Sequence, residues 1–239
     1  MMLALVGSGE YLPPMEVVDR ELLRRLPGEA KVVCLPTAAG TEGEERIGYW
    51  SKLGVQHFTR LGVAVEALQV IDRASANDAG LAAAISGANF VYLSGGKPDY
   101  LYRTLEGSLV WEAICGVLAA GGLLAGCSAG AMIMGEKFYG FPGMHPGFNL
   151  LPGATVIPHF DEMRGELVQT IRLLTSRDLT ILGVEGYTAL FVDGTSGSRP
   201  GSGEVLGSGG VTVWNRASKT RYTQGEIPAW REDGARAQD

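Results

Sequence analysis

LLAGCSAGAM, residues Leu123–Met132, is the stretch of this 239-residue chain that decides the fold. An apolar run leads into the pattern Gly-x-Ser-x-Gly around Ser128, and small helix-forming residues follow it. A serine placed after a strand in this pattern stands on a sharp strand-to-helix turn, where flanking glycines let neighbouring backbone come close. The alternative is a tight turn whose serine has no chemical role. The strand-like context favours a nucleophile at Ser128, and the adjacent Cys127 is then expected to point into the core.

Similar short apolar runs lie outward on both sides of this turn, bounded by Gly, Pro or Ser. Continuous runs of this kind are typical of strands that are covered on both faces. Because helix-like stretches alternate with them, we expect an α/β fold, a three-layer sandwich with a mostly parallel central sheet. The expected strands are Leu3–Val6, Lys31–Leu35, Ala64–Ile71, Asn89–Leu93, Leu123–Cys127 and Thr180–Val184. The expected helices are Glu16–Leu26, Glu44–Leu61 with an interruption at Gly54, Asp78–Ile85, Tyr100–Thr104, Leu109–Ala120 and Arg164–Thr175.

The last third of the chain has a different pattern, with short β-prone segments between clusters of Gly and Ser. These segments are Thr188–Val192, Glu204–Leu206 and Val211–Asn215. We expect them to form antiparallel strands that close the edge of the sheet. Since neither an internal repeat nor a linker is visible, we expect one domain over residues 1–239, with a polar tail at about Arg231–Asp239.

Composition argues against several classes of function. The net charge of -6 and the lack of a dense basic cluster argue against a nucleic-acid partner. The three cysteines lie in apolar stretches and no Cys or His pair has the spacing that zinc requires, so no metal and no cofactor is expected. The first apolar run is too short for a secretory signal, and no window approaches the roughly 20 apolar residues of a membrane span. Free thiols fit a reducing compartment, so we expect a cytoplasmic protein without a membrane partner.

A serine nucleophile needs a base, and the chain has three histidines. His57 falls within a helix-like stretch, which favours a surface or packing role. His145 lies in the loop sequence FPGMHPG, which could line a pocket. His159 follows the β-prone run Thr155–Pro158 and therefore stands at a strand end, where sheet-based active sites place their groups. We expect His159 to be the base.

The imidazole in turn needs a carboxylate that fixes its tautomer. Glu185 directly follows the run Thr180–Val184 and so also stands at a strand end, although a solvated loop acid is the alternative. We expect Glu185 to take this role. The other candidates after the histidine are Asp161, Glu162 and Asp193.

The segment FVYLSGGKPDYL, Phe90–Leu101, resembles a strand that ends in a glycine pair able to aim a backbone N–H at an oxyanion. Taken with the motifs GCSAGAM, FNLLPG followed by PHF, and LTILGVEG, it makes the chain resemble the family of aspartyl dipeptidase (peptidase E) and cyanophycinase. The resemblance runs from Val6 to about Val192. It implies a serine peptidase on a class I glutamine-amidotransferase-like, flavodoxin-like fold.

Carried over to this chain, the resemblance implies Ser128 as nucleophile, His159 as general base and Glu185 as the acid that orients it. It further implies an oxyanion hole formed by the backbone amides of Gly96 and Ala129.

Two departures from the family pattern concern the substrate pocket. Lys97-Pro98 follows the glycine pair, where the dipeptidases usually have Asn and the cyanophycinases an acidic or amide pair. After the histidine, the segment is several residues shorter than in the dipeptidases, and Arg164 is the nearest equivalent of the arginine that pairs with the substrate's aspartate. A solvated arginine is the alternative. Lys97, Arg164 and His145 are therefore the residues expected to bind substrate.

The expected function is that of a serine exopeptidase, dipeptidase- or aminopeptidase-like, which hydrolyses short peptides through an acyl-enzyme on Ser128. The alternatives are hydrolysis of a non-peptide amide or ester or of a cyanophycinase-like isopeptide, and a non-catalytic binding module on the same fold. The sequence leaves the residue preference and the oligomeric state open, with a homodimer as one option.

Overall fold

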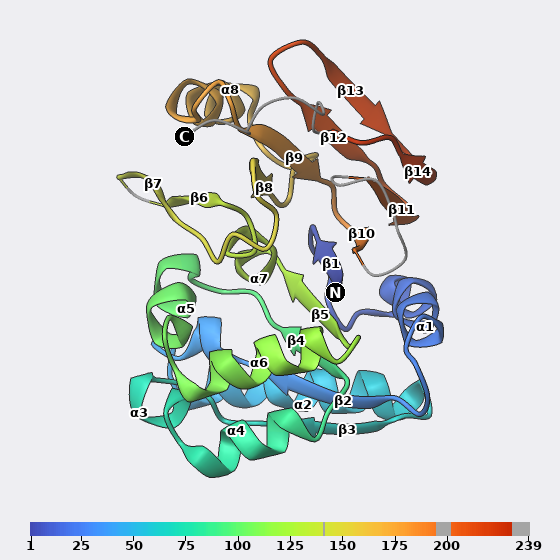
Figure 1. The fold of residues 1–239 in the computed structure, drawn as a ribbon, viewed down its shortest axis with the longest axis vertical. Helices are drawn as coiled ribbons and strands as arrows, with labels where there is room; N and C mark the ends of the chain where they lie inside the picture. The colour runs from blue at the N-terminus through green and yellow to red at the C-terminus, as the bar shows by residue number, and fades with distance from the viewer. Residues whose placement is uncertain (141, 195–201, 231–239) are drawn as a thin grey trace.

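The main sheet of the computed structural model, which describes residues 1–140, 142–194 and 202–230, has eight strands (Figure 1). In spatial order they are β14 (Gly225–Ile227), β11 (Gly203–Gly207), β10 (Thr188–Asp193), β1 (Met2–Val6), β5 (Leu123–Cys127), β4 (Phe90–Leu93), β2 (Lys31–Leu35) and β3 (Ala64–Ala67). The neighbours from β1 to β3 pair in parallel, whereas β10, β11 and β14 add antiparallel strands at the β1 side. The predicted tail, Arg231–Asp239, lies outside the described residues.

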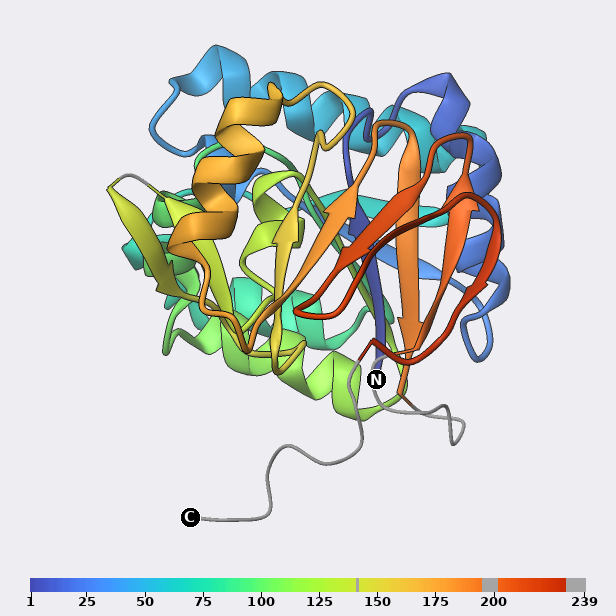
Figure 2. The same cartoon turned by 90° about the horizontal axis from the view of Figure 1, so that it is seen from above.

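Helices cover both faces of this sheet. Because successive side chains along a strand point to opposite faces, each strand contributes apolar side chains to both layers. One face packs against α1 (Glu16–Arg24) and α2 (Glu44–Arg60). The other packs against α3 (Arg73–Ala76), α4 (Ala79–Ser86), α5 (Pro98–Leu105) and α6 (Leu109–Ala119). Figure 2 shows the blue helices α1 and α2 on one side of the strands and the green helices on the other. The predicted three-layer α/β sandwich with a mostly parallel central sheet is confirmed.

A second, four-stranded sheet corrects two of the predicted strand positions. Its order is β13 (Lys219–Tyr222), β12 (Val211–Trp214), β9 (Thr180–Val184) and β8 (Ala154–Ile157). The run Thr180–Val184 was expected in the main sheet and Val211–Asn215 at its edge, but β9 pairs in parallel with β8 and antiparallel with β12. An apolar run indicates that both faces of a strand are buried, but it does not say which strand is its neighbour.

The second sheet also has apolar packing on both of its faces. Leu182, Val184 and Val211 pack into the same apolar cluster as the main sheet. On the opposite side, Ile181 packs with Ile171 of α8 (Gly165–Leu174). The short helix α7 (Ala129–Met132) and the hairpin of β6 (Lys137–Gly140) and β7 (Gly143–Pro146) connect β5 of the main sheet to β8 of the second sheet. No helix in the described ranges is long and apolar enough to cross a membrane.

Each predicted helix is present, with small shifts at its ends. Several begin at a residue whose side chain accepts a hydrogen bond from the first turn, as Asp78 does from Leu81 N–H and Ser108 from Trp111 N–H. The expected interruption at Gly54 is wrong, because α2 continues through it. A Cβ at Gly54 would lie 3.0 Å from Cys34 Sγ, so glycine here lets the helix lie close to the sheet.

His57 has the packing role that was one of its two expected roles. Its side chain and that of Asp19 on α1 are fully buried, and Nε2 lies 2.7 Å from Asp19 Oδ2. Burial raises the pKa of Asp19, since the apolar surroundings disfavour its charged form. The pair therefore links α1 to α2 inside the protein, and the alternative of a surface role for His57 is wrong.

Replacing His57 with alanine should destabilise the fold by about 3–5 kcal/mol, because the Asp19 carboxyl then loses its contact with the imidazole while remaining buried. Denaturant unfolding measures the change. The double variant Asp19→Ala/His57→Ala should lose clearly less than the sum of the single losses, since the two side chains act as a pair. Additive losses would contradict this interpretation.

Candidate active site

Ser128 stands between β5 and α7 with φ 50° and ψ −108°, a backbone conformation that is strained for a residue with a side chain. A Cβ at Gly126 would lie 2.4 Å from the carbonyl carbon of Gly130, and a Cβ at Gly130 would lie 2.7 Å from Leu93 O. Both positions therefore require glycine. The strand, sharp turn and helix that Gly-x-Ser-x-Gly predicts are all present, and Ser128 is only partly buried.

Cys127 has the packing position that the sharp turn predicts. Its side chain is fully buried among the residues under α1 and α2. Burial raises the pKa of its thiol well above the ordinary value, and the nearby charge of Glu10 adds to this effect. A protonated, buried thiol is unsuited to act as a nucleophile, so Ser128 is the candidate nucleophile at this turn.

The structure brings His159 to Ser128. His159 follows β8 by way of Pro158, has a positive φ of 52°, and places Nε2 3.2 Å from Ser128 Oγ. The hydroxyl comes from the end of a main-sheet strand and the imidazole from the end of a strand in the second sheet. The pair therefore forms only where the two sheets meet.

The acid expected at Glu185 is not brought to His159. Its carboxylate oxygens accept hydrogen bonds from Arg221 of β13, Nε to Oε1 at 2.5 Å and Nη2 to Oε2 at 2.6 Å, and Oε2 also accepts from Gly210 N–H at 2.8 Å. These bonds to Arg221 lower the pKa of Glu185. The carboxylate that faces His159 Nδ1 is that of Glu162, with Oε2 at 3.3 Å.

The other two acids weighed from the sequence are placed differently from one another. Asp161 lies near the site, where its Oδ1 accepts a hydrogen bond from Gly186 N–H at 2.8 Å. Asp193 pairs with Met2 at the start of β1, whereas the serine turn follows Cys127, which pairs with Val6 at the end of the same strand. Asp193 is thus at the opposite end of the sheet from Ser128.

The backbone amides of Gly96 and Ala129 are the predicted oxyanion donors. Among the described residues no group accepts a hydrogen bond from the N–H of Gly96 or of Ala129. Gly96 has φ 147°, and a Cβ there would lie 2.5 Å from Ala38 O, so this position also requires glycine. A Cβ at Gly95 would lie 3.4 Å from Ser128 Cβ, which shows how closely this loop lies against the serine.

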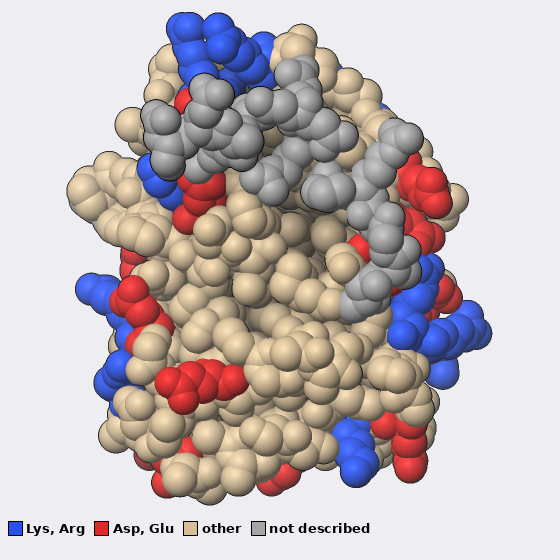
Figure 3. All heavy atoms as spheres, in the orientation of Figure 1, with Lys and Arg blue, Asp and Glu red and all other residues tan. Residues whose placement is uncertain are grey.

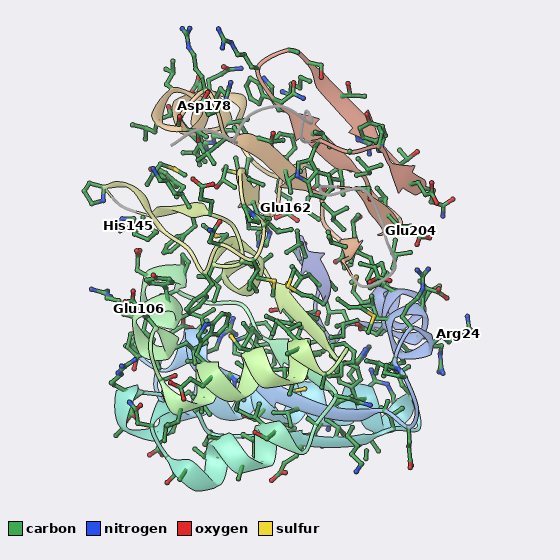
Figure 4. All side chains as sticks on the ribbon, in the orientation of Figure 1. Arg24, Glu106, His145, Glu162, Asp178 and Glu204 are labelled. Carbon is green, nitrogen blue, oxygen red and sulfur yellow. The ribbon has the colours of Figure 1, made fainter. Side chains whose placement is uncertain are left out.

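The residues expected to bind substrate lie on separate elements. Lys97 is exposed and donates from Nζ to Thr41 Oγ1 at 2.9 Å. Arg164 is exposed at the residue that precedes α8. His145 lies on β7 with Nδ1 3.7 Å from Asp99 Oδ1, and Figure 4 shows it on the hairpin, well apart from Glu162. Their part in binding stays a prediction.

Glu10 is a residue of the site that the sequence interpretation missed. It follows β1 within Gly7-Ser8-Gly9-Glu10, and its carboxylate accepts hydrogen bonds from Gly95 N–H and from the Cys127 thiol, both at 2.9 Å. The available signal was weak, namely an acidic residue placed directly after a glycine-rich strand end. Parallel pairing of β1 with β5 gives this loop its place beneath the serine turn.

Neither the distribution of surface charge nor the grouping of potential metal ligands indicates a further ligand within the described residues. On the face seen in Figure 3, charged side chains of both signs lie mostly around the edge, and uncharged residues form the centre. Within the described residues, no group of three or more His, Cys, Asp or Glu side chains could hold a metal ion.

Comparison with known proteins agrees with this geometry. The family model of peptidase family S51 matches residues 3–199. A crystal structure of a peptidase from an acI-B1 Actinobacterium is similar with a TM-score of 0.85 and 32% sequence identity, covering 95% of this chain and 96% of that one. A candidate peptidase E protein from Listeria monocytogenes EGD-e has a TM-score of 0.61 at 22% identity, covering 86% and 96%, and shows likeness of fold alone. No curated protein matches the chain.

The family match covers the whole stretch, Val6 to about Val192, over which the motifs predicted a resemblance. The resemblance to peptidase E is thereby confirmed. The chain belongs to peptidase family S51 and is a serine peptidase.

Proposed function

We propose that this chain is an exopeptidase, dipeptidase- or aminopeptidase-like, which hydrolyses short peptides through an acyl-enzyme on Ser128. The observation that carries the proposal is the 3.2 Å separation of His159 Nε2 and Ser128 Oγ on a strained turn. A serine hydroxyl becomes a useful nucleophile only when a neighbouring base can take its proton. His159 Nε2 is close enough to Ser128 Oγ to meet this requirement.

In the first half of the reaction, Ser128 Oγ attacks the scissile carbonyl carbon while His159 Nε2 takes the hydroxyl proton. The N–H groups of Gly96 and Ala129 donate to the carbonyl oxygen as it becomes an oxyanion. The intermediate then collapses, the C–N bond breaks, and His159 gives its proton to the leaving amine. A water molecule repeats the sequence on the acyl-enzyme, which releases the acid and restores the serine.

We assign Glu162 as the acid that orients His159, because its Oε2 lies 3.3 Å from Nδ1. The side chain of Glu162 is 62% exposed, so its charge is screened more than that of a buried triad acid. Glu185, implied by the family resemblance, is better shielded with 11% of its side chain exposed. To serve His159, however, Glu185 would have to give up its bonds to Arg221.

The preference for a free N-terminus is supported by the charges near the serine. Asp161 and Glu162 are exposed on the loop that follows β8, next to His159 and its contact with Ser128. Negative charge around a cleft attracts a cationic group such as the α-ammonium of a peptide. Matched peptides with free and acetylated N-termini, led by Asp, Arg, Leu or Met, test this directly. Faster hydrolysis of acetylated peptides, or of simple esters alone, would overturn the exopeptidase proposal.

Replacing Ser128 with alanine should lower turnover by about a thousandfold or more, as loss of the nucleophile removes several decades of rate. The melting temperature should change little, since the side chain is small and partly exposed. Peptide hydrolysis and thermal unfolding of the same preparation check both points. Residual activity above about a hundredth of wild type would exclude the serine mechanism.

His159→Ala should cost nearly as much activity as Ser128→Ala, because the two side chains act as one unit. His145→Ala is the matched control, a partly exposed histidine on the β6–β7 hairpin. It should alter KM more than kcat, if it alters either. An inactive His145 variant beside an active His159 variant would exchange their roles.

The acid is tested by comparing Glu162→Gln with Glu185→Gln at saturating substrate. If Glu162 orients the imidazole, its amide should lower kcat by about tenfold or more, below the roughly ten-thousandfold loss known for a buried triad acid. Glu185→Gln should instead lower stability, because it leaves Arg221 without its charged partner, while kcat stays within about threefold. A large loss of kcat in Glu185→Gln alone would return the role to Glu185.

A further inference from the structure

The loop that follows β1 braces the loop that follows β4. Glu10 Oε1 accepts a hydrogen bond from Gly95 N–H at 2.9 Å. The next residue, Tyr11, brings its hydroxyl to 3.0 Å from Ser94 Oγ. Two consecutive residues of one loop thus hold two consecutive residues of the other, directly before Gly96.

Glu10 also reaches the serine turn. Its second carboxylate oxygen, Oε2, accepts a hydrogen bond from the thiol of Cys127 at 2.9 Å. The residue is only 7% exposed, and a buried carboxylate is costly unless donors satisfy its oxygens. Here one oxygen is satisfied from the end of β4 and the other from the last residue of β5. The side chain therefore ties together the two strand ends between which an oxyanion would bind.

Gly96 depends on such support for the direction of its N–H. Glycine has the widest choice of backbone conformation, so an unsupported Gly-Gly segment does not keep one peptide orientation. On one side Gly95 N–H is held by Glu10, and on the other Lys97 N–H donates to Ala38 O at 2.9 Å. Between them, the N–H of Gly96 has no acceptor among the described residues. The bonds on either side therefore fix the backbone that flanks Gly96.

We propose that Glu10 is a positioning residue, which holds the Gly96 amide at a fixed place beside Ser128 through its bonds to Gly95 and Cys127. The proposal rests on the proposed peptidase mechanism, in which that amide donates to the oxyanion. Glu10 acts by the length of its side chain and by its acceptor oxygen, and its negative charge is not required. This separates a positioning role from a general electrostatic one.

Variants of equal length distinguish these roles. Glu10→Gln keeps an acceptor oxygen for Gly95 N–H and should keep kcat within about threefold of wild type. Glu10→Met fills the same space without an acceptor and should lower kcat by about tenfold to a hundredfold, approaching the cost of losing an oxyanion donor, with KM little changed. Glu10→Asp keeps the charge but is one methylene shorter, and it should behave like Glu10→Met.

Glu136 offers a matched control. Its Oε2 accepts a hydrogen bond from Gly153 N–H at 2.7 Å, the same type of contact, next to the start of β8. Glu136→Asp and Glu136→Met should leave kcat unchanged when corrected for the folded fraction. If Glu10→Asp does not fold, the comparison of Glu10→Gln with Glu10→Met still decides the question, since neither changes the length of the side chain.

Two quantities are measured for each variant. One is the turnover of whichever peptide the wild-type protein hydrolyses fastest in the N-terminus comparison, and the other is the rate at which a fluorophosphonate labels Ser128. In both, the Gln variant should match wild type and the Met variant should be slow. Equal rates in all Glu10 variants, or a slow Gln variant beside a fast Asp variant, would overturn the positioning role and leave the peptidase mechanism intact. Wild-type protein that is neither labelled nor active would overturn the proposed function, and the role of Glu10 would fall with it.

Discussion

The close approach of backbone at the end of β5 is the constraint on which the rest of the site depends. Gly126 and Gly130 let the chain reverse so sharply that a Cβ at either position would penetrate the backbone of a neighbour. This turn exposes the Ser128 hydroxyl and sends Cys127 into the core. It also brings the serine against the loop after β4, because β4 and β5 are parallel neighbours and end at the same edge.

The site is built from two sheets, and their packing sets its geometry. The serine and the glycine loop come from the main sheet, whereas His159 comes from the end of β8 in the second sheet. Leu182 and Val184 of that sheet share an apolar cluster with Leu93 and Leu124 of the main sheet. Apolar burial therefore holds His159 beside Ser128, since dense packing leaves little freedom for one sheet to shift against the other.

The carboxylates around the site divide according to their partners. Glu185 accepts hydrogen bonds from Arg221. Glu10 accepts hydrogen bonds from the Gly95 N–H and the Cys127 thiol, so the oxygens of both carboxylates are already engaged within the protein. Glu162 is the carboxylate that contacts the imidazole, at the exposed side of the site. Position at the end of a strand was thus a sound reason to place Glu185 nearby. It was insufficient to choose its partner, because an arginine from a distant strand competes for the same oxygens.

Local pattern by itself determined the strand that leads to Ser128, the helices and the three-layer class, because apolar periodicity and glycine spacing act over a few residues. It also singled out Ser128 and His159, each of which stands at or just beyond the end of a short strand. Only the tertiary structure decided that Thr180–Val184 belongs to a second sheet, that Glu185 pairs with Arg221, and that Glu10 lies beneath the serine turn. These features depend on contacts between residues far apart in the chain, and such contacts follow from how whole sheets pack, which no short pattern encodes.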